Sequence, residues 1–83
     1  MTEFYVLLHS MQDVKQFVTA ASLSPVDIDV CSGRYTVDAK SILGVCSLEP
    51  GKPVQVRVYG SAQDGENFKN GVSDMIAEAP KEQ

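Results

Sequence analysis

The most distinctive segment of this chain covers residues 40–48 and reads Lys40-Ser41-Ile42-Leu43-Gly44-Val45-Cys46-Ser47-Leu48. Serine is a preferred residue at the start of a helix, so a short helix is expected to begin at Ser41. Most of the residues after Ser41 are apolar, and there are more of them than one helical face can bury. Such a helix either is fully buried or exposes apolar surface for a reason, which makes this segment a candidate binding surface.

The sequence on both sides of this segment predicts a sheet with one covered and one solvated face. Apolar and polar residues alternate with a period of two, which is the pattern of half-buried strands. Four strands are predicted on this basis, over residues 3–8, 26–31, 34–38 and 54–59. A two-residue hairpin turn at Ser32-Gly33 is expected to join the second strand to the third.

Two longer helices are predicted as well. The first follows Ser10, where Asp13 three residues later gives the capping-box pattern, and it ends before Pro25. The last helix is predicted over residues 63–79, and Gly65 and Gly71 weaken it by about 1 kcal/mol each relative to alanine. The element order is therefore βαββαβα, an α+β fold with a four-stranded antiparallel sheet and three helices on one face.

Composition limits the classes of function. A chain of 83 residues is expected to form one domain over residues 1–83, with 80–83 as a flexible tail. The formal net charge of −4 argues against nucleic-acid binding. No apolar run is long enough for a membrane span, and the start of the sequence has no secretory pattern, so a cytoplasmic protein is expected.

The inventory of reactive residues is small. Cys31 and Cys46 fit neither a disulfide framework nor a zinc spacing, so two free thiols are expected. The sequence contains no metal-ligand cluster, no Ser-His-Asp set and no glycine-rich phosphate loop. We therefore expect no metal, no cofactor and no enzymatic activity.

Residues 40–48 resemble a segment of the histidine-containing phosphocarrier (HPr) family of the bacterial sugar phosphotransferase system. The family pattern is close to Lys-Ser-Ile-Met-Gly-Val-Met-Ser-Leu, which differs from this chain only at Leu43 and Cys46. The resemblance covers nearly the whole chain. It implies an open-faced β-sandwich with strand order 1-4-2-3, and it implies enzyme I and enzyme IIA-type proteins as partners.

In the family, a histidine at the start of the first helix accepts the phosphoryl group, within the pattern His-Ala-Arg-Pro-Ala. Aligned without gaps from Ser41, the histidine, arginine and proline positions hold Ser10, Gln12 and Asp13. The loop before that helix also looks about three residues shorter, judged from the strand register.

The phosphoryl acceptor is therefore in question. His9 is the only histidine and is the one remaining candidate. Asp13 places a negative charge where the phosphate would sit, and Lys15 is the only cation nearby in the sequence. Ser10 is explained as a capping hydroxyl.

The resemblance implies two further features of the short helix. In some bacteria the serine at the position of Ser41 is phosphorylated by HPr kinase, and the product binds a transcriptional regulator; a plain helix cap is the simpler interpretation. The residues after the serine dock partners, which makes Ile42, Leu43 and Cys46 the expected exposed set, while Val45 and Leu48 face the core. Met11 is expected at the rim of this surface.

Three functional hypotheses remain open from the sequence. The first is a regulatory or protein-binding module that kept the docking surface and lost the phosphoryl relay. The second is a working phosphocarrier that uses His9 in an altered loop. The third is an accessory structural domain with a partner unrelated to sugar transport.

Overall fold

The computed structural model describes residues 1–49 and 51–80 of the chain. Its strands are β1 (Thr2–Val6), β2 (Asp27–Ser32), β3 (Tyr35–Asp38), β4 (Val54–Tyr59) and β5 (Ile76–Ala77). Its helices are α1 (Met11–Ser22), α2 (Ile42–Cys46), α3 (Ala62–Gly71) and the 3₁₀ turn η1 (Ser73–Met75). The tail predicted over residues 80–83 therefore lies outside the described residues except for residue 80.

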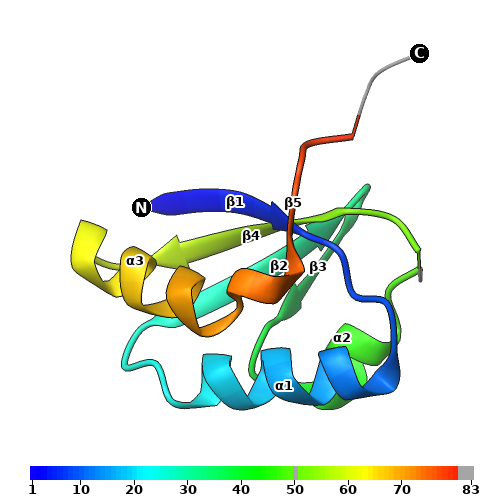
Figure 1. The fold of residues 1–83 in the computed structure, drawn as a ribbon, viewed down its shortest axis with the longest axis horizontal. Helices are drawn as coiled ribbons and strands as arrows, with labels where there is room; N and C mark the ends of the chain where they lie inside the picture. Colours follow the sequence, from blue (N-terminus) through cyan, green and yellow to red (C-terminus); the bar gives the residue numbers. More distant parts are fainter. Residues whose placement is uncertain (50, 81–83) are drawn as a thin grey trace.

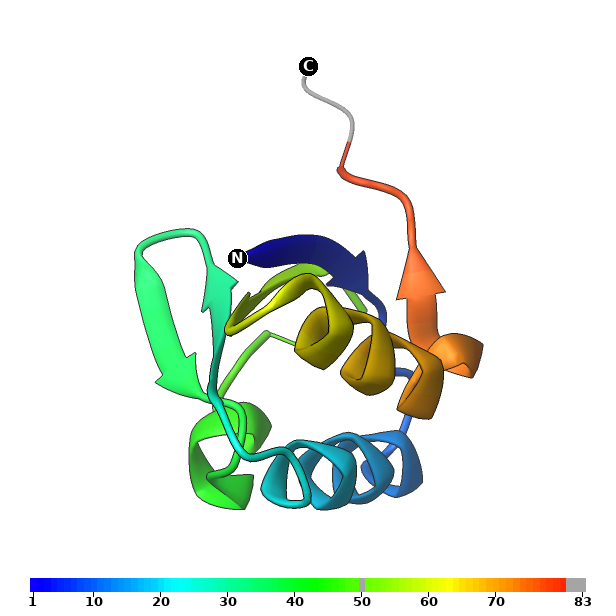
Figure 2. The same ribbon diagram turned by 90° about the vertical axis from the view of Figure 1, so that its left-hand side faces the viewer.

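The strands form one antiparallel sheet in the order β3-β2-β4-β1-β5. The predicted order 1-4-2-3 is confirmed, and β5 extends the sheet by a short fifth strand beside β1. All three α-helices lie on one face of the sheet (Figures 1 and 2). No helix in the described part of the chain is long and apolar enough to cross a membrane.

The sheet register follows from the alternating valines of β4. Val54, Val56 and Val58 are buried under the helices, and Val56 lies opposite Phe4 of β1 and Val30 of β2. A slip of one residue would turn every valine to the solvated face, so burial fixes the pairing.

Three aromatic rings join the helices to the sheet. Phe17 of α1 is fully buried and meets the Phe68 ring of α3 edge-on, with ring centroids 5.5 Å apart. Phe68 in turn lies 6.2 Å from the Phe4 ring of β1. Because aromatic pairs in these geometries add to area burial, this cluster sets how α1 and α3 pack on the sheet.

The end of the last helix differs from its prediction. The backbone leaves the helix at Val72, where φ is −124° and ψ is 27°, and continues through η1 into β5. This path buries Val72 and Met75 and lets the Leu7 N–H donate to the Met75 carbonyl at 2.8 Å. Ile76, which lies within the predicted helix 63–79, is instead in β5 and 39% exposed, because pairing with β1 replaces further helical turns.

The hairpin turn between β2 and β3 lies one residue later than predicted. Ser32 pairs with Tyr35, so the turn consists of Gly33 and Arg34. Gly33 has a φ of 58° and is the only residue of the turn with a positive φ. Glycine at the first central position is the requirement of a type II′ turn, which explains the shift.

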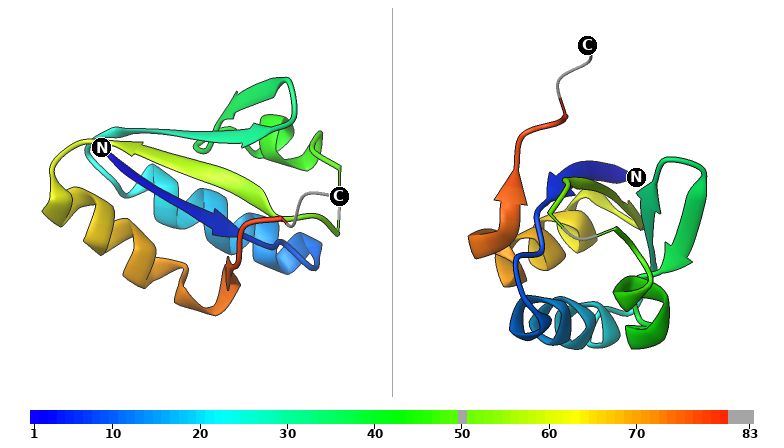
Figure 3. Two further views of the ribbon diagram at one scale, coloured as in Figure 1. Left: turned by 90° about the horizontal axis from the view of Figure 1, so that it is seen from above. Right: turned by 90° about the vertical axis from the view of Figure 1, so that its right-hand side faces the viewer.

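The other face of the sheet carries no helix and is visible from above in Figure 3. Arg57 of β4 forms an ion pair with Glu3 of β1 there, with Nε and Oε2 3.1 Å apart. A side-chain hydrogen bond with Tyr59 and nearby negative groups raise the pKa of Arg57 above its usual value. This cross-strand pair lies far from the helical layer, so it does not contribute to the site described next.

Candidate functional site

The N-terminus of α1 is capped by side chains of its own first turn. Ser10 is the N-cap, and its Oγ accepts a hydrogen bond from the Asp13 N–H at 3.2 Å. The Asp13 carboxylate accepts from the backbone N–H of His9 at 2.9 Å, not from that of Ser10 as the predicted capping box requires. The half-buried Asp13 therefore places its negative charge at the electropositive end of the helix, which is the position that an anion would otherwise take.

His9 is exposed and lies one residue before the cap. Within residues 1–49 and 51–80, its ring forms no hydrogen bond or ion pair. It lines a cavity of about 210 Å³ between the start of α1, the end of α2 and the loop that leads into β4. The floor of this cavity is apolar, with Leu8, Val14 and Val45 among its lining residues.

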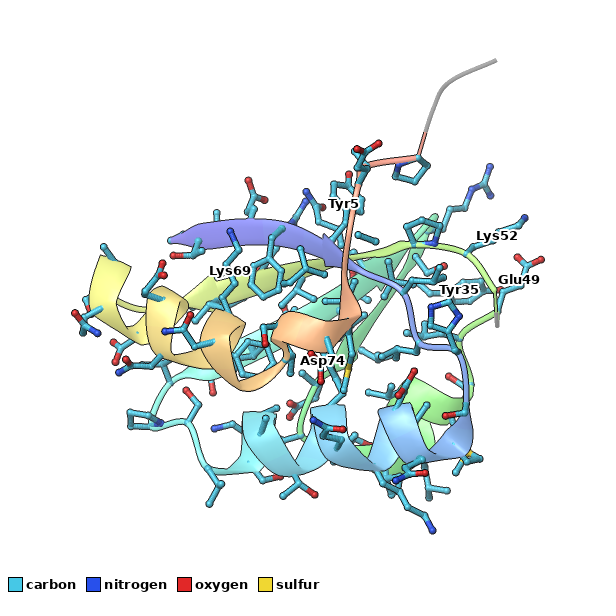
Figure 4. All side chains as sticks on the ribbon, in the orientation of Figure 1. Tyr5, Tyr35, Glu49, Lys52, Lys69 and Asp74 are labelled. Carbon is cyan, nitrogen blue, oxygen red and sulfur yellow. The ribbon has the colours of Figure 1, made fainter. Side chains whose placement is uncertain are left out.

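A positively charged side chain from a distant part of the sequence also lines this cavity. Lys52 lines the same cavity as His9. Its Nζ lies 3.3 Å from Oε1 of Glu49, which also lines the cavity, and Figure 4 shows both side chains by the loop before β4. Both side chains are about two-thirds exposed, so solvent screens this pair and its contribution to stability is small. Lys15 is the only cation near His9 in the sequence, whereas the fold brings Lys52 to the cavity that His9 lines.

The residues of α2 that were expected to be exposed are exposed in the structure. Ile42 is 41% exposed, Leu43 is 82% exposed and Cys46 is exposed, whereas Val45 is buried and Leu48 is partly buried. Met11, at the start of α1, is 53% exposed. The two helices lie side by side in Figure 2. We call the surface formed by Met11, Ile42, Leu43 and Cys46 the α1–α2 patch.

Met11 and Cys46 meet directly. The Cys46 thiol points at the Met11 thioether, and the two sulfur atoms are 3.8 Å apart. This contact joins the first residue of α1 to the last residue of α2. The two halves of the patch therefore form one continuous surface beside His9.

Ser41 forms the cap that its sequence position predicts. Its Oγ accepts the Gly44 N–H at 3.1 Å, and the residue is exposed. A Cβ on Gly44 would lie 3.2 Å from the Cβ of Val37, so glycine lets α2 approach β3 closely. The Lys40 ammonium donates to the Ser24 carbonyl at 3.1 Å, so in this structure it is engaged away from Ser41.

Comparison with known proteins gives similarity in structure only. The sequence matches no model of a protein family and no curated protein. The fold resembles HPr-C-His from Thermoanaerobacter tengcongensis, with a TM-score of 0.73 and 26% identity over 89% of each chain. It also resembles phosphocarrier protein HPr from Bacillus anthracis str. Ames, with a TM-score of 0.70 and 22% identity over 89% of this chain and 95% of that one. The fold expected from residues 40–48 is thereby confirmed.

Proposed function

Because the chain has the HPr-like fold, we propose that it is a cytoplasmic protein-binding module. It docks a partner through the α1–α2 patch and does not relay a phosphoryl group. In this proposal the protein is a binding partner rather than an enzyme, and it uses no metal or cofactor for docking. The start of α1, which carries the histidine in the family pattern, has become a structural helix cap.

One observation carries the proposal. The Asp13 carboxylate occupies the electropositive end of α1 through its bond to the His9 N–H, while the adjacent apolar patch remains exposed. A phosphate beside this carboxylate would face charge repulsion, and Gln12 at the position of the family's arginine supplies no positive charge to offset it. The patch itself has no such conflict, and exposed apolar clusters on small domains mark interaction sites.

The fold supports proteins as the class of partner. The resemblance of residues 40–48 to the HPr family suggests four partners, namely enzyme I, enzyme IIA-type proteins, HPr kinase and a transcriptional regulator. The patch has an apolar centre, and Glu49 and Lys52 lie at its edge around the cavity. A partner with a matching apolar surface and a mixed polar rim suits it.

Phosphoryl transfer is tested first. The protein is incubated with enzyme I, phosphoenolpyruvate and Mg²⁺, next to an ordinary HPr as the positive control, and intact mass is measured. We expect the control to gain one acid-labile phosphoryl group and this protein to gain none. A stoichiometric label that disappears in His9→Ala would overturn the proposal.

Docking is tested with two leucines of equal exposure. Leu43 in the patch and Leu23 at the other end of α1 are both 82% exposed. Leu23 lies 12 residues after Met11, which is about 18 Å along the helix axis. We expect Leu43→Ser to weaken binding of enzyme I at least tenfold in calorimetric titration, and Leu23→Ser to leave it unchanged. Equal effects of both substitutions would exclude the patch as the docking site. No binding by the unsubstituted protein would favour an accessory domain with an unrelated partner.

The second candidate function is phosphoryl transfer through His9. It is favoured by the exposed ring and by Lys52 on the same cavity, since a lysine can accompany a phosphate as a point charge. The same mass experiment decides between the two functions. If His9 is the acceptor, Lys52→Ala is expected to slow labelling, whereas Lys15→Ala is not.

Regulation through Ser41 is a further possibility within the proposed module. The exposed Oγ is accessible to a kinase, and a phosphate there would add negative charge next to the apolar patch. Incubation with HPr kinase and ATP is expected to give a base-stable phosphate that is absent in Ser41→Ala. If the kinase adds no phosphate to a protein whose unfolding midpoint shows that it is folded, Ser41 is not a regulatory site.

A further inference from the structure

Three residues with metal-binding side chains line one cavity, and two of them are in contact. The Met11 and Cys46 sulfur atoms are 3.8 Å apart across the contact between α1 and α2. His9 lies two residues before Met11 and lines the same cavity as both. Docking of a partner protein requires only the apolar surface and explains neither the paired sulfur atoms nor the neighbouring imidazole.

The separation of the two sulfur atoms suits a shared metal ion. Metal–sulfur bonds in proteins are about 2.3 Å long, so an ion bonded to both atoms at 3.8 Å would subtend an angle of about 110°. That angle lies between those of regular tetrahedral and trigonal sites. The two sulfur atoms are therefore close enough for one ion to bond to both.

The types of ligand atom determine which metal ion the site would prefer. A thioether is a weak ligand for hard cations, and a thiolate with a thioether favours the soft ion Cu(I), which imidazole also suits. Glu49 supplies one exposed carboxylate on the same cavity, and hard cations such as Ca²⁺ require several oxygen ligands. We propose that Met11 and Cys46 bind one Cu(I) ion, with the ring of His9 as the third ligand.

The surroundings of the three side chains support this assignment. The His9 backbone is fixed by its bond to Asp13, whereas the ring has no polar partner among the described residues and is available to a metal. Leu8 and Val14 line the inner side of the cavity, so the ion would lie against apolar groups and exchange water on its outer side only.

Binding is a ligand exchange without a change of oxidation state. The Cys46 S–H bond breaks, its proton passes to solvent, and the thiolate forms a bond to Cu(I). The thioether and an imidazole nitrogen each donate a lone pair. Because one proton is released for each ion, apparent affinity is expected to fall as the pH is lowered.

The test uses the full chain under anaerobic conditions with ascorbate and Cu(I), in competition with the chelator bicinchoninate. We expect one tightly held Cu(I) ion per chain. Cys46→Ser is expected to abolish it, and Met11→Leu and His9→Gln are each expected to weaken it at least tenfold. Cys31→Ser, which removes the thiol in β2, is the matched control and is expected to bind as the unsubstituted chain does.

A second measurement identifies the ligand directly. The ¹³C-labelled Met11 methyl signal is expected to shift on addition of Cu(I), while those of Met1 and Met75 stay in place. Unchanged affinity in both Met11→Leu and His9→Gln would mean that Cys46 reacts only as an ordinary exposed thiol, and the proposal would be wrong. Loss of binding in Cys31→Ser would overturn it equally. Both measurements are independent of enzyme I, so their failure leaves the docking proposal unaffected.

Discussion

Replacing either of two glycines in α3 by alanine is expected to have opposite effects on stability. Gly65 is buried against β1, and a Cβ added there would overlap the Cβ, hydroxyl and methyl groups of Thr2. Gly71 ends the helix and is exposed, and a Cβ there would lie at an ordinary 3.6 Å from the Cβ of Ala20. Alanine at position 65 should therefore strain the contact between α3 and β1, whereas alanine at position 71 should not.

The magnitudes follow from two competing terms. Glycine to alanine within a helix gains up to about 1 kcal/mol of stability. Overpacking a filled contact costs about 1–3 kcal/mol, and the upper half of that range applies because the overlap includes the Thr2 Cβ, which moves only with its backbone. We expect Gly65→Ala to lower the free energy of unfolding by about 1–2 kcal/mol, and Gly71→Ala to raise it by about 0.5–1 kcal/mol.

Thermal unfolding followed by circular dichroism measures the difference. For a chain of this size, 1 kcal/mol corresponds to about 4–8 °C in Tm, so the two variants should differ by roughly 10 °C. Thr2→Gly is the matched test of cause, because it removes the overlapping side chain and should make Gly65→Ala neutral or stabilising in its background. A Gly65→Ala variant as stable as Gly71→Ala, or one that Thr2→Gly does not rescue, would refute the packing argument.

Four further substitutions, at three positions, report on the caps and the patch. Asp13→Ala is expected to lower the free energy of unfolding by about 1–2 kcal/mol in urea titration, because it removes both the negative charge and the acceptor for the His9 N–H. Asp13→Asn keeps an acceptor and should lower it by less. Equal losses in the two variants would mean that only the charge matters. Ser61→Ala should cost about 1 kcal/mol by the same assay, because it removes the Oγ that accepts the Asp64 N–H at the start of α3, while the backbone N–H of residue 61 can still donate to the Asp64 carboxylate; a neutral result would contradict the capping role of the hydroxyl. Leu43→Ser should change stability by less than about 0.5 kcal/mol, since the side chain is 82% exposed, and a larger loss would show that Leu43 is structural rather than part of a docking surface.

The sheet and the two predicted serine caps could be predicted from the sequence because each rests on a short-range rule. The alternating valines of β4 have one arrangement that buries them all, and serine bonds to backbone only three residues away. The end of α3 follows no such rule. Val72 would be buried whether the helix continued or the chain turned into β5. Which of the two forms depends on pairing with the backbone of β1, some 70 residues earlier.

The candidate site was predicted in part for the same reason. The exposed side of α2 followed from the family resemblance and agrees with the exposure of Ile42 and Leu43 in the structure. The position of Lys52 beside His9 did not follow, because 43 residues and a loop of irregular structure separate them. The partner of the Asp13 carboxylate was also missed, since the pattern Ser-x-x-Asp does not specify which of two adjacent N–H groups donates to the carboxylate.

The place of β1 in the sheet affects how the chain folds during its synthesis. β1 is made first, yet its two neighbours, β4 and β5, are made only after residues 54 and 76. Until then its backbone has no strand to pair with, and its apolar residues remain open to other chains. We therefore expect nascent chains that stop before β4 to be bound by chaperones or degraded, and the native state to be reached only after residue 77 has left the ribosome.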